Sequence, residues 1–155
     1  MREYLDNYRL TLEMKCGGLS AEQLARRSVP PSTLSLLGLI RHVAQMENHW
    51  FQRVLQARTD GPSLFKHEDD RDADFNGAIA DPAVVEEAFA AWKAEIGAAD
   101  KWLEELNEDD LGRHVSMGEE TVSIRDVIVH VVEEYARHAG HADLLRECID
   151  GRTGQ

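Results

Sequence analysis

The chain has 155 residues, of which 43% are hydrophobic, and we expect residues 1–155 to form a single domain with a core of ordinary size. Its formal net charge of −12 at pH 7 and its scattered basic residues argue against a nucleic-acid partner. No apolar run approaches the roughly 18 residues of a membrane span, and the N-terminus lacks a signal-peptide pattern, so we expect a cytoplasmic protein without a membrane partner.

The first third of the chain predicts two long helices with a short one between them. The first runs over Arg2–Cys16 and ends at the glycines 17–18; its apolar face consists of Tyr4, Leu5, Tyr8, Leu12 and Cys16. Residues 20–23 read as the capping box of a short helix. The second long helix is predicted over Leu34–Ala57, with a broad apolar face.

The middle of the chain predicts a long loop, a third helix and a small hairpin. Arg58–Ala80 is rich in Asp, Gly and Lys and lacks helical periodicity, which is typical of a loop that covers a site or is disordered. A helix is predicted over residues 82–106, with Asp81 as its N-cap. The segment His114–Val122 alternates weakly around Gly118 and indicates a short hairpin.

The last helix carries two polar residues where hydrophobic ones are expected. It begins after a Ser123 cap, ends at Gly151, and has a core-facing stripe of Val127, Val131, Glu134, His138, Ala142 and Leu145. Burying a carboxylate and an imidazole costs free energy unless a partner compensates them. Because residues four apart present their donor atoms on one helix face, Glu134 and His138 are candidate metal ligands.

Four long amphipathic helices predict an all-α four-helix bundle, whose topology the long crossover leaves open. The spacing of His42 places it with Leu39 and Met46, toward the core or a cleft. If the second and last helices face one another, His42, Glu134 and His138 form a set of two nitrogens and one oxygen. Such a set leaves a coordination position open for water or substrate, as in catalytic zinc sites, although nickel or iron would also accept it.

Each candidate residue also has a simpler interpretation. A single histidine on an apolar face is more often a core residue with a hydrogen-bond partner, and Glu134 is in an otherwise charged helix. His141 and His130 are alternative ligands or, like Glu47, candidates for side chains that orient the ligands; for His130 simple exposure is the plainer alternative.

No other catalytic motif competes with this set. Cys16 and Cys148 lie near opposite ends of the chain without a paired spacing, so we expect reduced structural thiols. The sequence contains no nucleophilic triad and no phosphate-binding glycine loop, so we expect any catalysis to use the metal.

Two segments resemble the DinB superfamily of metal-binding four-helix bundles. Residues 39–50 are similar to its second-helix motif, and residues 134–141 to its His-x-x-x-His-x-Gly segment, with Glu134 in place of the first histidine. This departure favours the branch related to mycothiol-dependent maleylpyruvate isomerase, in which a His, Glu, His set binds zinc. The resemblance implies that His42, Glu134 and His138 bind zinc and that a low-molecular-weight thiol such as mycothiol is the cofactor.

We therefore expect a metal-dependent enzyme, with zinc as the metal, that uses such a thiol in transfer, isomerisation or detoxification of a small molecule. Because we expect no additional C-terminal domain of the kind that completes the isomerase site, maleylpyruvate is not an expected substrate. The alternatives are a metal-dependent hydrolase and a non-enzymatic stress-response module that its metal stabilises. Because many bundles of this kind pair, a homodimer is a further hypothesis for this chain.

Overall fold

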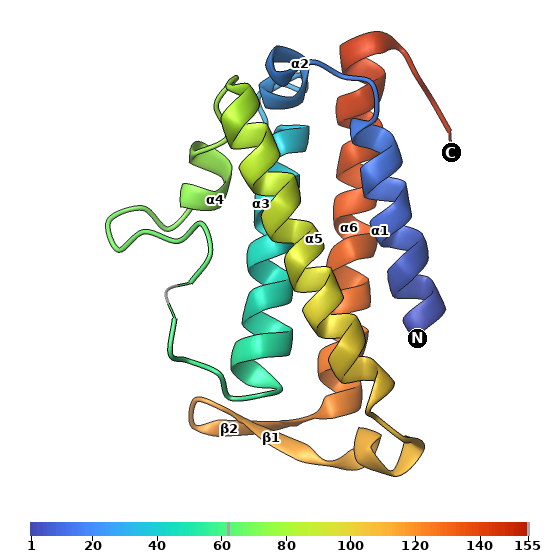
Figure 1. The fold of residues 1–155 in the computed structure, drawn as a ribbon. Helices are drawn as coiled ribbons and strands as arrows, with labels where there is room; N and C mark the ends of the chain where they lie inside the picture. Colours follow the sequence, from blue (N-terminus) through green and yellow to red (C-terminus); the bar gives the residue numbers. More distant parts are fainter. Residues whose placement is uncertain (62, 155) are drawn as a thin grey trace.

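The computed structural model describes residues 1–61 and 63–154, and four long helices in this part of the chain pack as a bundle (Figure 1). They are α1 (Arg2–Cys16), α3 (Leu36–Glu47), α5 (Pro82–Glu104) and α6 (Ile124–Asp150). In Figure 1, α1 and α6 run in one direction and α3 and α5 in the other, so the long crossover lets α3 and α5 lie parallel. The predicted four-helix bundle is confirmed, and the contact of α3 with α6 brings the two predicted ligand-bearing helices together.

Short elements fill the connections between the long helices. They are α2 (Ala21–Ala25), α4 (Ala73–Asn76), the 3₁₀ helix η2 (Glu108–Gly112) and the strands β1 (His114–Met117) and β2 (Glu120–Ser123). The strands pair antiparallel, with His114 opposite Ser123, and Gly118 turns between them at a φ of 66°. The predicted hairpin is thus confirmed. The expectation that Arg58–Ala80 is entirely a loop is wrong, because α4 lies within it; a single turn is too short to give a periodic signal.

The second long helix differs from its predicted bounds of Leu34–Ala57 at both ends. Ser35 caps α3, since its side chain accepts a hydrogen bond from the backbone N–H of Gly38. After Glu47 the chain continues as the π-helix η1 (Asn48–Val54), in which wider turns replace α-helical ones. Trp50 lies in one of these turns, and the centre of its ring is 4.8 Å from the centre of the His130 ring. Apolar spacing over two turns does not distinguish the two helix types.

The ends and the buried stripe of α6 agree with the prediction. Ser123 accepts from the backbone N–H of Asp126, and Gly151 ends the helix in the left-handed conformation, at a φ of 78°. Four apolar members of the stripe are buried, namely Val127, Val131, Ala142 and Leu145. On α1 the prediction fails for Tyr4, which is 64% exposed, because the buried face centres on Leu5 and Leu12.

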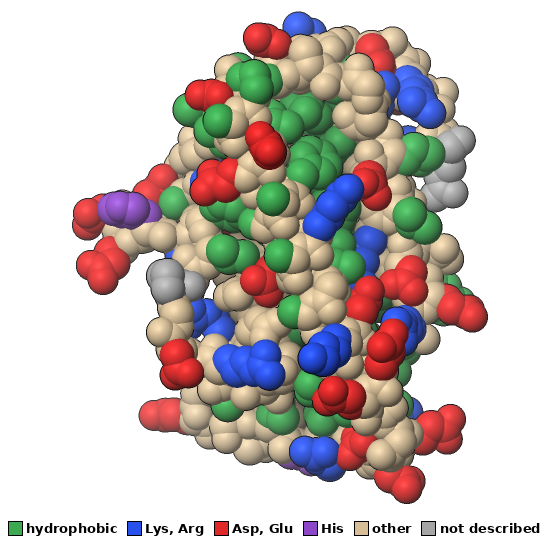
Figure 2. Space-filling model, viewed as in Figure 1, with side chains coloured by type: hydrophobic (Ala, Val, Ile, Leu, Met, Phe, Trp, Pro, Cys, Tyr) green, Lys and Arg blue, Asp and Glu red, His purple; other side chains and the backbone are tan. Residues whose placement is uncertain are grey.

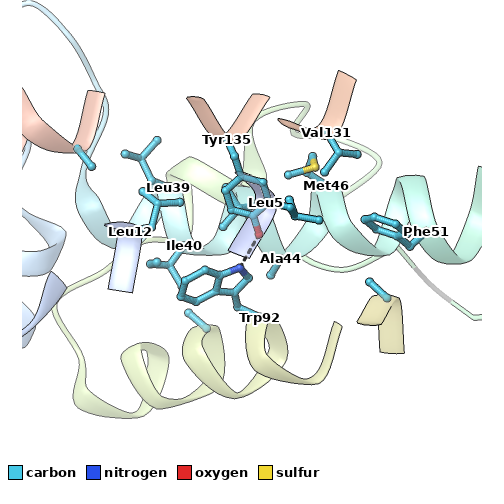
Figure 3. Close-up of a cluster of buried hydrophobic side chains, with 14 of the residues drawn as sticks. Leu5, Leu12, Leu39, Ile40, Ala44, Met46, Phe51, Trp92, Val131 and Tyr135 are labelled. Carbon is cyan, nitrogen blue, oxygen red and sulfur yellow. Dashed lines mark hydrogen bonds between the residues drawn. The ribbon is translucent and has the colours of Figure 1, made fainter. Parts of the chain in front are cut away.

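A buried polar network joins all four long helices. Trp92 of α5 donates to the hydroxyl of Tyr135 on α6 over 2.8 Å, as Figure 3 shows, and this hydroxyl donates to Glu47 of α3 over 2.7 Å. Arg9 of α1 donates to both oxygens of Glu47, at 2.8 and 2.9 Å. Because Tyr135 follows Glu134 directly, the network also fixes how α6 is rotated at the candidate ligands.

Arg9 and Glu47 form an ion pair inside the bundle. Burial raises the pKa of Glu47, and Arg9 and Tyr135 oppose that rise. Burial alone would lower the pKa of Arg9, but the charge of Glu47 raises it. Since Arg9 reaches both carboxylate oxygens, we treat the pair as ionised.

The surface carries mixed charge. On the face in Figure 2, Lys and Arg side chains are interspersed with Asp and Glu, and hydrophobic side chains gather in the upper part. Among the described helices, none combines the length and the apolar character needed to cross a membrane.

Candidate metal centre

The structure brings the three predicted ligands together between α3 and α6. The Oε2 atom of Glu134 lies 3.5 Å from Nε2 of His138 and 4.0 Å from Nε2 of His42. One donor atom from each of the three residues lies within 4.8 Å of the others. The side chains of His42, Glu134 and His138 are 20%, 14% and 9% exposed, so the cluster is mostly buried but still reachable from the surface.

The donor set fits a divalent cation with a vacant coordination position. Ligands held at about 2.0–2.1 Å from zinc in a tetrahedron lie about 3.4 Å apart, so the observed spacing requires only a small inward movement of side chains. Two imidazoles and one carboxylate match the ligand types of catalytic zinc sites. Nickel and iron accept the same ligands, so the donor types do not select the metal.

His42 is oriented by a residue from the long crossover. Its Nδ1 atom lies 2.8 Å from Oδ2 of Asp74, which is 2% exposed at the start of α4. Burial would raise the pKa of Asp74, but the hydrogen bond and the charge of His42 hold it below its usual value. With Asp74 ionised, Nδ1 of His42 is the donor, and Nε2 faces Glu134.

Glu134 and His138 are each held by a neighbour on α6. Arg137 donates to Oε1 of Glu134 over 2.8 Å and leaves Oε2 facing the two histidines. Nδ1 of His138 lies 3.3 Å from Nδ1 of His141. Burial, followed by the neighbouring His42 and His141, lowers the pKa of His138 to about 3. The imidazole of His138 is therefore neutral at pH 7, as a metal ligand must be.

The three residues predicted to orient the ligands occupy different positions. His141 contacts His138, as described above. Glu47 pairs with Arg9 and Tyr135 in the core. The side chain of His130 is 43% exposed and lies against Trp50, one turn before Glu134.

Two further contacts of the centre come from α4, which the sequence does not reveal. Asp74 bonds to His42, and the ring of Phe75 stacks on that of His42 at a centroid distance of 4.8 Å and an interplanar angle of 23°. Both lie in the stretch predicted as a loop. The one available signal was that long loops often cover a site.

The two cysteines lie in contrasting environments, and neither contacts the centre among the described residues. Burial raises the pKa of Cys16 to about 12, whereas Cys148 is exposed. We expect iodoacetamide at mildly alkaline pH to modify only Cys148 in the native protein and both cysteines in denaturant, because the thiolate is the reactive form. Mass spectrometry of the adducts checks this result. Equal labelling rates in the native protein would contradict the assignment of Cys16 as a buried structural thiol.

Comparison with known proteins adds a family and a related fold. The model of a family described as mycothiol-S-transferase matches residues 1–151. A solved structure described as a conserved protein from Enterococcus faecalis superposes with a TM-score of 0.72 and 15% sequence identity, over 97% of this chain and 95% of the other. At that identity the likeness concerns the fold alone. No curated protein matches the chain significantly.

Proposed function

The chain belongs to the mycothiol-S-transferase family, a DinB-like family, and from this premise we propose that it is a metal-dependent transferase acting on a thiol. The thiol would be mycothiol or a close analogue, and its sulfur would be joined to a small electrophilic molecule. The observation that carries the proposal is the convergence of His42, Glu134 and His138 in a partly open cluster. We take zinc as the metal because the resemblance to the DinB branch implies it; the donor set itself would also accept nickel or iron.

In this proposal the three side chains hold the cation between α3 and α6. When bound, the cation supplies Lewis acidity, which lowers the pKa of a thiol that joins it. Arg137 and Asp74 keep Glu134 and His42 in position through the contacts described above. The buried walls around the cluster exclude bulk water from most of its surface, which strengthens electrostatic interactions there.

The reaction balances without an additional redox partner. The thiol loses its proton to solvent, and a lone pair of the sulfur forms a bond to an electrophilic carbon. In a substitution, the leaving group departs with the electrons of the bond that breaks. In an addition, the π bond of a carbon–carbon double bond breaks, and its electrons move to the neighbouring carbon, which then takes up a proton.

An assay of thiol consumption tests this function. Zinc-loaded protein is mixed with mycothiol and a model electrophile such as a haloaromatic compound or a maleimide, and the S-conjugate is quantified by mass spectrometry. We expect conjugate formation above the uncatalysed rate, loss of this excess rate after chelation, and its return when zinc is added. An excess rate that survives chelation would contradict a metal-dependent transferase.

The same assay distinguishes the transferase from a hydrolase. A hydrolase would use a metal-bound water and would release product from an ester or amide without consuming thiol. Hydrolysis at a rate independent of mycothiol, with no conjugate from any electrophile, would replace the proposal with this alternative.

A further inference from the structure

The long crossover supplies a carboxylate to the candidate centre. We propose that Asp74 is a positioning residue that selects Nε2 of His42 as the metal donor and couples the docking of α4 to metal binding. This inference rests on the metal site of the proposed function, but it concerns metal affinity and the state of the His42 ring rather than thiol chemistry.

The carboxylate of Asp74 makes two hydrogen bonds. Its Oδ2 atom lies 2.8 Å from Nδ1 of His42, and its Oδ1 atom accepts from the backbone N–H of Phe75 over 3.1 Å. A carboxylate only accepts hydrogen bonds, so the proton between Asp74 and His42 is on Nδ1. In the neutral ring, the lone pair is then on Nε2, which is the nitrogen that faces Glu134. Free imidazole side chains favour the opposite tautomer, so this contact changes the state of the ring.

The ring of His42 also packs against two other rings. Phe75 stacks on it, and the ring of His138 meets it edge-on at a centroid distance of 4.6 Å. Phe75 in turn packs against α3 at Gly38, where an added Cβ atom would lie 3.2 Å from its ring. Because the ring stacks on Phe75, contacts His138 and is bonded at Nδ1, it is held with Nε2 toward Glu134.

Asp74 is also held in place by contacts other than its bond to His42. Arg41, the neighbour of His42, donates to the backbone carbonyl of Asp74 over 2.8 Å and to that of Ala73 over 3.3 Å. The guanidinium group also lies 4.0 Å from the centre of the Phe65 ring. Arg41 therefore attaches the crossover to α3 through these contacts. Within the crossover, Asp74 is the residue that contacts both Arg41 and His42.

Coupling follows from these contacts. If docked α4 raises the affinity of the centre for a cation, then a bound cation must stabilise docked α4 by the same factor. Metal binding is thus expected to protect the backbone amides of α4 from hydrogen exchange, although no residue of α4 is among the proposed ligands.

Metal affinity in matched variants tests the proposal. Zinc affinity is measured by competition with a chromophoric chelator for the wild type, Asp74→Ala, Asp74→Asn and the control Asp72→Asn. Asp72 is exposed, lies two residues away, and makes no capping hydrogen bond with its side chain. We expect about 10- to 100-fold weaker binding for Asp74→Ala, a smaller loss for Asp74→Asn, whose amide oxygen can still accept, and no change for Asp72→Asn.

Two spectroscopic readouts separate positioning from a general loss of structure. At a pH at which the ring of His42 is neutral, its nitrogen-15 shifts in metal-free protein are expected to report the Nδ1–H tautomer in the wild type and a change toward Nε2–H in Asp74→Ala, with an unchanged circular dichroism spectrum. Zinc is expected to slow hydrogen exchange in residues 73–76 of the wild type and to lose this effect in Asp74→Ala.

Several results would overturn the proposal. Zinc affinity of Asp74→Ala within about twofold of that of Asp72→Asn would remove the positioning role, as would an unchanged tautomer of His42. If the wild type binds no zinc, both the proposed metal centre and the proposed role of Asp74 are wrong. A wild type with the expected affinity ratios but no thiol transfer would contradict only the proposed function.

Discussion

Glu134→Gln is expected to weaken zinc binding by more than about 100-fold and to remove metal-dependent activity to the same extent. Removing a residue that only orients a ligand weakens metal binding by about 10- to 100-fold. Removing a charged ligand itself is expected to weaken it by more than that. The substitution preserves the size of the side chain, so the bundle itself is expected to stay folded. Chelator competition measures the affinity, and thermal unfolding of the metal-free protein checks the fold.

The adjacent residue provides the control for this substitution. Glu133 is also on α6, its side chain is 67% exposed, and its nearest basic contact is 4.0 Å away, at His130. Glu133→Gln removes the same charge from the same turn and is expected to leave zinc affinity unchanged. If the two variants bind zinc equally well, Glu134 is not a ligand, and the carboxylate on the core-facing stripe needs another explanation.

Arg9→Leu is expected to lower the free energy of unfolding by about 3–5 kcal/mol, because it leaves the carboxylate of Glu47 buried without its cation. Glu47 is fully buried, and Arg9 is 5% exposed. Denaturant titration followed by circular dichroism measures the loss. Arg9→Leu combined with Glu47→Gln removes the unpaired charge and is expected to recover part of the stability.

A second arginine on the same helix is the control for Arg9. Arg2 pairs with Glu104 at 3.1 Å, but both side chains are largely exposed, at 46% and 64%. Exposed ion pairs contribute little to stability because water and salt screen them. Arg2→Leu is therefore expected to unfold close to the wild type. Similar unfolding of the two leucine variants would show that the buried pair does not stabilise the bundle.

The sequence was sufficient to predict the bundle and the three converging residues. Apolar spacing gave α1 its bounds, and Ser123 and Gly151 marked the two ends of α6 because capping depends on local residue type. Polar residues on a buried stripe are costly, so Glu134 and His138 stood out from the apolar residues around them. Each of these predictions uses the residues of a single helix. The convergence of the three side chains required one further assumption, that α3 faces α6.

The remainder of the centre depends on contacts between distant segments. Asp74 is one of several acidic residues in an irregular stretch, and nothing in its local sequence distinguishes it from exposed Asp72. Its burial results from the docking of α4 on α3 through Arg41, 33 residues earlier in the chain. The position of Glu47 depends in the same way on Arg9 and Tyr135, each on a different helix. Contacts of this kind join segments that are far apart in the chain, and the apolar periodicity of a single helix does not predict them.

The most direct test of the central claim is a titration of cobalt-substituted protein with mycothiol, followed by absorption spectroscopy. If His42, Glu134 and His138 hold a cation with a position open to sulfur, mycothiol is expected to produce a thiolate-to-cobalt charge-transfer band in the wild type. Glu133→Gln should give the same band, and Glu134→Gln should not bind cobalt under these conditions. A cobalt spectrum that does not change at saturating mycothiol, while the cobalt remains bound, would contradict the account.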